Sequence, residues 1–172
     1  MILSTHAVIG AAIGAYVPSN PALALALGFA SHFALDAIPH WDYPIRSASL
    51  TSHRDAPIRL NRALIVDLLT IGSDGLLGVA VAMTLFGSIG NRSAVLLGAI
   101  GAMLPDPLQL VPDRIPGEPL RTLERFHRRM HSKLKIAALP FGIASQLILV
   151  AVVVCMSKQA HLPEFLDVWA NG

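Results

Sequence analysis

The sequence predicts an all-α membrane protein, a polytopic bundle of about five transmembrane or re-entrant helices. Three observations lead to this class. Of the 172 residues, 53% are apolar and only 14% are charged, whereas about 25% of residues are charged in a typical soluble domain. The first 35 residues contain no Lys, Arg, Asp or Glu. No strand-like alternation is sustained, so the apolar segments are expected to be helices. A very hydrophobic soluble helical protein is the alternative.

Five apolar segments account for most of the chain. They run over about Ile2 to Val17, Ala22 to Ile38, Ala63 to Phe86, Ala94 to Val111 and Ile136 to Met156. A helix that crosses a bilayer needs about 20 apolar residues. The third and fifth segments meet this length, whereas the other three are marginal and are expected to include short, tilted or re-entrant helices. We therefore predict a single integral membrane domain over residues 1–172.

The basic residues lie almost entirely in two polar connections, at about residues 40–62 and 112–135. Only Arg92 and Lys158 lie outside them. With five spans both connections fall on one side of the membrane, and the positive-inside rule places that side in the cytoplasm. We expect an inner (cell) membrane protein of a bacterium or archaeon, with its N-terminus and its polar connections in the cytoplasm.

The ionisable residues of the apolar segments are unusual in type and position. In SHFALDAIPHWD, His32, Asp36 and His40 follow at intervals of four, which would stack them on one face of a helix. Ionisable residues in membrane helices are costly and usually mark function. The predicted topology brings further candidates to the same cytoplasmic side, namely His6, Asp42, Asp67, Asp74, Asp106, His127 and His131.

Imidazole and carboxylate groups are the ligands expected for zinc, or for iron or manganese where oxygen ligands dominate. The candidates exceed the four ligands of one tetrahedral ion, so two or more ions are plausible, with Asp36 as a bridging ligand. Such ions can activate a water molecule and stabilise charge on a phosphoryl group. Asp42 or Asp67 would then accept a proton, and Arg128 or Arg129 would hold the phosphate.

Several candidates also have simpler interpretations. Asp106 could end a helix beside two prolines, and Asp67 could favour a helix dipole from the first turn. His127 and His131 could lie on a solvated basic amphipathic helix, RTLERFHRRMHSKLK, that rests on anionic lipid. The His32–Asp36–His40 pattern is the hardest to explain without a metal.

Short motifs of the chain resemble those of a known family. THAVIGAAIG, GAIGAMLPDP and FHRRMHS are similar to motifs of the membrane-bound metal-dependent hydrolases related to the LexA-regulated inner-membrane protein of enteric bacteria. GFASHFALDAIPHWD also resembles the signature of zinc-dependent phospholipases C and related single-strand nucleases. Met130 stands where the hydrolase motif has Thr, and LPDP lacks the family's second acidic residue. The resemblance implies seven metal ligands, His6, His32, Asp36, His40, Asp106, His127 and His131.

We therefore expect a membrane-embedded hydrolase that uses one to three divalent ions, zinc above all, to cleave a phosphoester at the cytoplasmic face. A phospholipid or another small-molecule phosphoester is the expected substrate, membrane lipid is an expected partner, and no nucleic acid is expected. The alternative is a metal-binding or ion-conducting membrane protein without hydrolase activity, in which Asp67 and Asp74 line a path. A scaffold whose basic connections bind anionic lipid is a third possibility.

Overall fold

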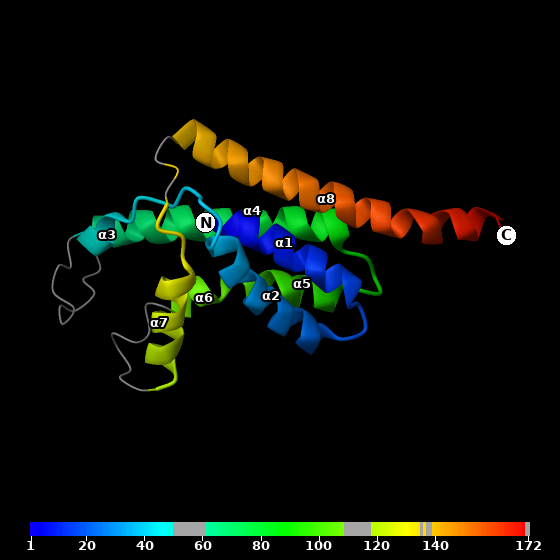
Figure 1. Ribbon diagram of the computed structural model, residues 1–172, viewed down its shortest axis with the longest axis horizontal. Helices are drawn as coiled ribbons and strands as arrows, with labels where there is room; N and C mark the ends of the chain where they lie inside the picture. The colour runs from blue at the N-terminus through cyan, green and yellow to red at the C-terminus, as the bar shows by residue number, and fades with distance from the viewer. Residues whose placement is uncertain (50–60, 109–117, 135, 137–138, 171–172) are drawn as a thin grey trace.

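The computed structural model describes residues 1–49, 61–108, 118–134, 136 and 139–170, and every regular element in these residues is a helix (Figure 1). The all-α prediction is confirmed for this part of the chain. The helices are α1 (Leu3–Tyr16), α2 (Pro21–Asp36), α3 (Arg46–Ser49), α4 (Arg62–Phe86), α5 (Arg92–Met103), α6 (Pro105–Leu108), α7 (Leu120–Met130) and α8 (Leu139–Ala170).

Two helices of the described residues are long and apolar enough to cross a membrane, α4 and the segment Pro140–Lys158 of α8. Helices α1, α2 and α5 are apolar but shorter. Large apolar side chains cover the outside of both long helices, and their exposure favours a lipid environment over water. The most exposed are Leu68, Leu69, Leu76, Leu77, Phe141, Leu147, Ile148 and Met156.

Helix α1 forms the centre of the bundle. It packs against α2, α4 and α5, and α8 runs along it (Figure 1). Its small residues Ala7 and Ala11 are fully buried against Ala82 of α4 and against Val95 and Ala99 of α5. Because so many residues at these contacts are small, the helix backbones approach closely, as is typical of packing inside membranes.

The closest approach joins α1, α2 and α5. A Cβ atom added to Gly10 of α1 or to Gly28 of α2 would collide with the carbonyl oxygen of Gly98 in α5. A Cβ atom on Gly98 would in turn collide with the carbonyl oxygen of Gly10. These three glycines therefore set the spacing of the helices that carry much of the candidate site.

Helix starts follow local sequence signals. The side chain of Asn20 accepts a hydrogen bond from the Leu23 N–H, and Pro21 occupies the first turn of α2. Asn61 caps α4 in the same way. Asparagine at the N-cap satisfies a backbone N–H that has no partner within the helix, so both helices begin where the sequence provides such a cap.

Helix α2 ends earlier than the spacing of its polar residues suggests. Its last residue is Asp36, and His40 lies outside the helix. The prediction that His40 continues the helical face of His32 and Asp36 is therefore wrong. Pro39 explains the difference, because proline lacks an N–H and disfavours helical geometry in the residue before it.

The later segments also differ from the prediction. The fourth apolar segment is divided, since α5 ends at Met103 and the short α6 begins at Pro105. The predicted polar connection at 112–135 contains helix α7, which runs across the direction of α4 and α8 in Figure 1. Residues 50–60, 112–117 and 135 of the two connections, and 109–111 at the end of the fourth apolar segment, lie outside the described residues.

We predict that Gly98→Ala destabilises the protein, because its Cβ would push apart the backbones of α1 and α5. Overpacking of this kind costs about 1–3 kcal/mol. Gly72→Ala in α4 is the matched control, since a Cβ there meets no atom within 4 Å. Thermal unfolding in detergent should show a lower midpoint for Gly98→Ala and an unchanged or higher one for Gly72→Ala. Equal midpoints would contradict the packing described.

Candidate metal centre

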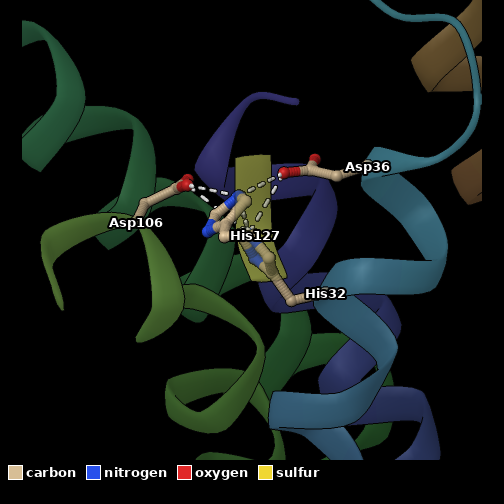
Figure 2. A group of neighbouring side chains, drawn as sticks. All are labelled: His32, Asp36, Asp106 and His127. Atoms are coloured by element: carbon tan, nitrogen blue, oxygen red, sulfur yellow. Dashed lines mark hydrogen bonds and ion pairs between the residues drawn. The ribbon is translucent and has the colours of Figure 1, made fainter. Parts of the chain in front are cut away.

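The candidate centre lies around Asp36, the last residue of α2. Its side chain is fully buried. Figure 2 shows it facing His32 of α2, His127 of α7 and Asp106 of α6, whose side chains converge from these three helices. An ionised carboxylate in such a buried position requires opposite charge or hydrogen-bond donors around it.

One group of potential ligands consists of His32, Asp36, Asp106 and His127, whose ligand atoms all lie within 4.8 Å of one another. Asp36 Oδ2 lies 3.1 Å from His32 Nε2 and 3.0 Å from His127 Nε2. The Nε2 atoms of His32 and His127 are 3.3 Å apart, and Asp106 Oδ1 lies 3.4 Å from His32 Nε2. A tetrahedral zinc ion with bonds of about 2.0–2.1 Å separates its ligands by about 3.3 Å. Four of the separations are close to this value, and the His127 Nε2–Asp106 Oδ1 distance of 3.9 Å is longer, so the group could hold one metal ion.

A second group shares Asp36 and adds His40 and His131. The Nε2 atoms of these two histidines lie 3.8 Å from Asp36 Oδ1 and Oδ2, respectively. Asp42 lies beside the same group, 2.9 Å from His40 Nε2 and 3.6 Å from His131 Nε2. Asp36 belongs to both groups, and its Oδ1 also accepts a hydrogen bond from the α-amino group of Met1 at 3.1 Å.

His6 of α1 completes the surroundings of Asp36. Its Nε2 lies 3.2 Å from Asp36 Oδ1, and its ring stacks on that of His32 with centroids 4.1 Å apart. Both ring nitrogens of His6 are buried without a hydrogen-bond partner in the described residues. His6 belongs to neither ligand group, so the structure places it against the Asp36 carboxylate and leaves its role as a ligand a prediction.

The tautomers of three histidines are set by backbone carbonyls. The Nδ1–H groups of His32, His40 and His131 donate to the carbonyl oxygens of Ala102, Ile38 and Ser132, at 2.8, 2.6 and 3.2 Å. A carbonyl oxygen only accepts, so Nδ1 must carry the proton. In the neutral rings Nε2 then presents a lone pair, which is the form that binds a metal, and the carbonyl partner fixes the ring orientation.

Each of these Nε2 lone pairs faces carboxylate oxygens, which also carry lone pairs. A cation is needed between them, either a proton or a metal ion. At His32 the Nε2 atom faces Asp36, Asp106 and the Nε2 of His127 together, and one proton can join only two of these atoms. A divalent ion can bind all four. The buried Nε2 atoms of His6 and His40 also face carboxylate oxygens, of Asp36 at 3.2 Å and of Asp42 at 2.9 Å.

Backbone hydrogen bonds hold the two histidine-bearing segments together. The Ser132 N–H donates to the Asp36 carbonyl at 2.7 Å, and the Ile136 N–H donates to the His40 carbonyl at 3.2 Å. The chain after α7 therefore runs beside residues 36–40. Helix α7 is the basic helix foreseen as an alternative, but its His127 is buried and faces Asp36 rather than solvent.

The loop after α2 carries strongly shifted acid groups. Burial raises the pKa of Asp42, but His40 and the α-amino group of Met1, 2.8 Å away, outweigh it and hold the pKa well below its usual range. Burial and a hydrogen bond to Asp74 raise the pKa of the neighbouring Tyr43 above its usual range. At neutral pH Asp42 is therefore a carboxylate and Tyr43 a neutral phenol.

The centre is partly exposed at three residues. The side chains of Asp42, His131 and Asp106 are 25%, 26% and 31% exposed, whereas those of the other ligand candidates are at most 2% exposed. Solvent therefore reaches both ligand groups, the first at Asp106 and the second at His131 beside Asp42.

Two residues predicted to take part in catalysis lie elsewhere among the described contacts. Asp67 accepts hydrogen bonds from the backbone N–H groups of Arg46 and Ser47, at 3.2 and 2.7 Å, and belongs to neither ligand group. Arg128 lies on the exposed face of α7 and pairs with Glu124 at 3.1 Å. The structure does not place either side chain against Asp36.

Two other residues that the sequence reasoning overlooked contact the surroundings of the centre. The hydroxyl of Tyr43 donates to Asp74 and accepts from the Leu3 N–H at 3.2 Å. Gln146 of α8 is buried and bonds to the start of α1 and to the loop after α2. A signal existed for Gln146, since a lone amide side chain in an otherwise apolar membrane segment is unusual.

No protein family matches the chain, and neither a curated protein nor a solved structure gives a match.

We predict that the purified protein binds two zinc ions and that ligand variants lose them selectively. His32→Ala should lose the ion of the first group, His40→Ala that of the second, and Asp36→Ala both, because only Asp36 belongs to both groups. Asp67→Asn is the control and should retain both. Elemental analysis of detergent-purified protein provides the measurement. A wild-type protein without transition metal, or an Asp36→Ala variant with full metal, would refute the centre.

Proposed function

We propose that the protein is a membrane-embedded, metal-dependent hydrolase that cleaves a phosphoester, such as a phospholipid, with zinc ions held around Asp36. One observation carries this proposal. A fully buried carboxylate faces the Nε2 atoms of five histidines at 3.0–3.8 Å, and two further carboxylates lie beside them. The motif resemblance to membrane-bound metal-dependent hydrolases supports the same assignment.

We place five helices of the chain in the bilayer. Helix α4 has 25 residues and is about 37 Å long, which exceeds the hydrocarbon thickness of about 30 Å. Helices α1, α2 and α5 have 14, 16 and 12 residues and reach about 18–24 Å. These shorter helices fit a site sunk below the membrane surface, because their polar ends need not extend to bulk water. The positive-inside rule then assigns the site to the cytoplasmic side.

We assign different roles to the exposed and the buried residues of the centre. Zinc ions would supply a Lewis acid for the phosphoryl oxygens and lower the pKa of a water molecule. We assign the acceptance of that proton to Asp42, a partly exposed carboxylate. Its low pKa makes it a weak base, so the step would depend on a metal ion that lowers the pKa of the water. Asp106 and His131 are also partly exposed. His32 and His127 form the buried part of the site.

The described contacts give little support to ion conduction. Asp74 is engaged by the hydroxyl of Tyr43 and by the Ser4 N–H at 2.9 Å. Beyond it, the sequence of α4 is apolar from Gly75 to Phe86 apart from Thr84, and Leu76 and Leu77 face outward. The competing function is metal binding without hydrolysis, which an activity measurement separates from our proposal.

We predict phosphodiesterase activity on a chromogenic diester or a phospholipid that is lost on chelation and restored by zinc. Asp42→Asn should lower kcat by about 100-fold or more, the usual contribution of a general base. Asp67→Asn should retain activity, because its carboxylate only accepts backbone hydrogen bonds from Arg46 and Ser47. Zinc-loaded protein with no activity on either substrate would favour the metal-binding alternative.

We further predict that the polar connections face the cytoplasm. In a Cys155→Ser background, Lys133→Cys should resist a membrane-impermeant thiol reagent in intact cells and react after lysis. Gly90→Cys, in the turn between α4 and α5, should react in intact cells, since no atom would crowd a side chain there. The reverse labelling pattern would invert the orientation, and labelling of both positions would contradict the five-span arrangement.

A further inference from the structure

Gln146 is a buried amide within the candidate membrane span of α8. Its side chain is 2% exposed. An amide in such surroundings is costly unless its donors and acceptor are all bonded. The Gln146 carbonyl accepts from the Ile2 N–H at 3.0 Å and from the Thr5 hydroxyl at 3.4 Å. Its amide nitrogen donates to the carbonyl oxygens of Trp41 and Gly142, both at 3.1 Å.

These partners leave the amide only one orientation. The Ile2 N–H can only donate, so it must meet the Gln146 oxygen. The Trp41 carbonyl can only accept, so it must meet the nitrogen. All four hydrogen-bonding positions of the amide are used, and three of the bonds leave α8 for other parts of the molecule. Gln146 therefore joins α8 to the start of α1 and to the loop after α2.

Trp41 is the residue between His40 and Asp42, whose side chains meet at 2.9 Å. Helix α8 holds Trp41 at two points. Gln146 binds its carbonyl oxygen, and Gly142 lies so close to its side chain that a Cβ there would collide with it. The backbone between His40 of the second group and the neighbouring Asp42 is thus fixed by α8, although α8 contributes no member of either ligand group in the described residues.

We propose that Gln146 is a positioning residue for the second ion, the one held by Asp36, His40 and His131 beside Asp42. This inference rests on the proposed metal centre. Gln146 fixes the Trp41 peptide and thereby the approach of His40 and Asp42 to the ion. Gln146 reaches the first ligand group only through the shared Asp36, by way of the Ile2 N–H and the α-amino group of Met1, in the described contacts. The second ion should therefore depend on Gln146 more than the first. Groups that hold metal ligands in their orientation change the metal affinity by about 10–100-fold.

The test is a zinc competition titration on the full-length protein in detergent, which resolves the dissociation constants of the two ions. Gln146→Leu should raise the dissociation constant of the second ion by about 10–100-fold and leave the dissociation constant of the first ion unchanged. Gln146→Glu should act in the same direction, because a carboxylate cannot donate to the Trp41 carbonyl. Ser145→Ala is the matched control, since the Ser145 hydroxyl bonds only to Gly142 within α8.

A double substitution separates positioning from general structure. In a His40→Ala background, where the second ion is already lost, Gln146→Leu should cause no further loss of zinc. Cobalt substitution provides a spectroscopic check, because only the absorption bands of the second ion should change. Normal affinity for both ions in Gln146→Leu, or equal weakening of both, would overturn the positioning role. A wild-type protein that binds no metal would instead refute the centre itself.

Discussion

The arrangement of this protein depends on one buried carboxylate. Asp36 carries its charge fully buried at one end of an apolar helical bundle, where an unpaired ion would be far too costly to bury. Polar groups from several helices therefore surround its two oxygens. The helices that carry these groups must end or pass close to the Asp36 carboxylate. The ends of α2 and α7 and the first turns of α1 are placed by this requirement.

Close helix packing makes that convergence possible. The contacts of Gly98 with Gly10 and Gly28 bring the backbones of α1, α2 and α5 together. At this spacing the rings of His6 and His32 stack, and the Nδ1–H of His32 reaches the carbonyl of Ala102 in the last turn of α5. A larger residue at any of the three glycines would separate groups that must lie within hydrogen-bonding distance of each other.

Much of this could be predicted from the sequence, because helices and ligand chemistry have local signals. The apolar segments and their charged connections indicated the helices. The resulting topology predicted that the His and Asp candidates lie at the same end of the helical bundle. The path of the chain near His40 depends on how Pro39 ends α2, which the four-residue spacing alone did not reveal. The contacts of Gln146 join residues more than a hundred positions apart, and no local pattern determines such pairings.

The two ligand groups share one carboxylate and reach solvent through different residues. In the first group, His32 and His127 are buried and Asp106 is 31% exposed. In the second, His40 is buried and His131, like the neighbouring Asp42, is about a quarter exposed. Because Asp36 belongs to both groups, an ion bound in either one would also fix the carboxylate that the other uses.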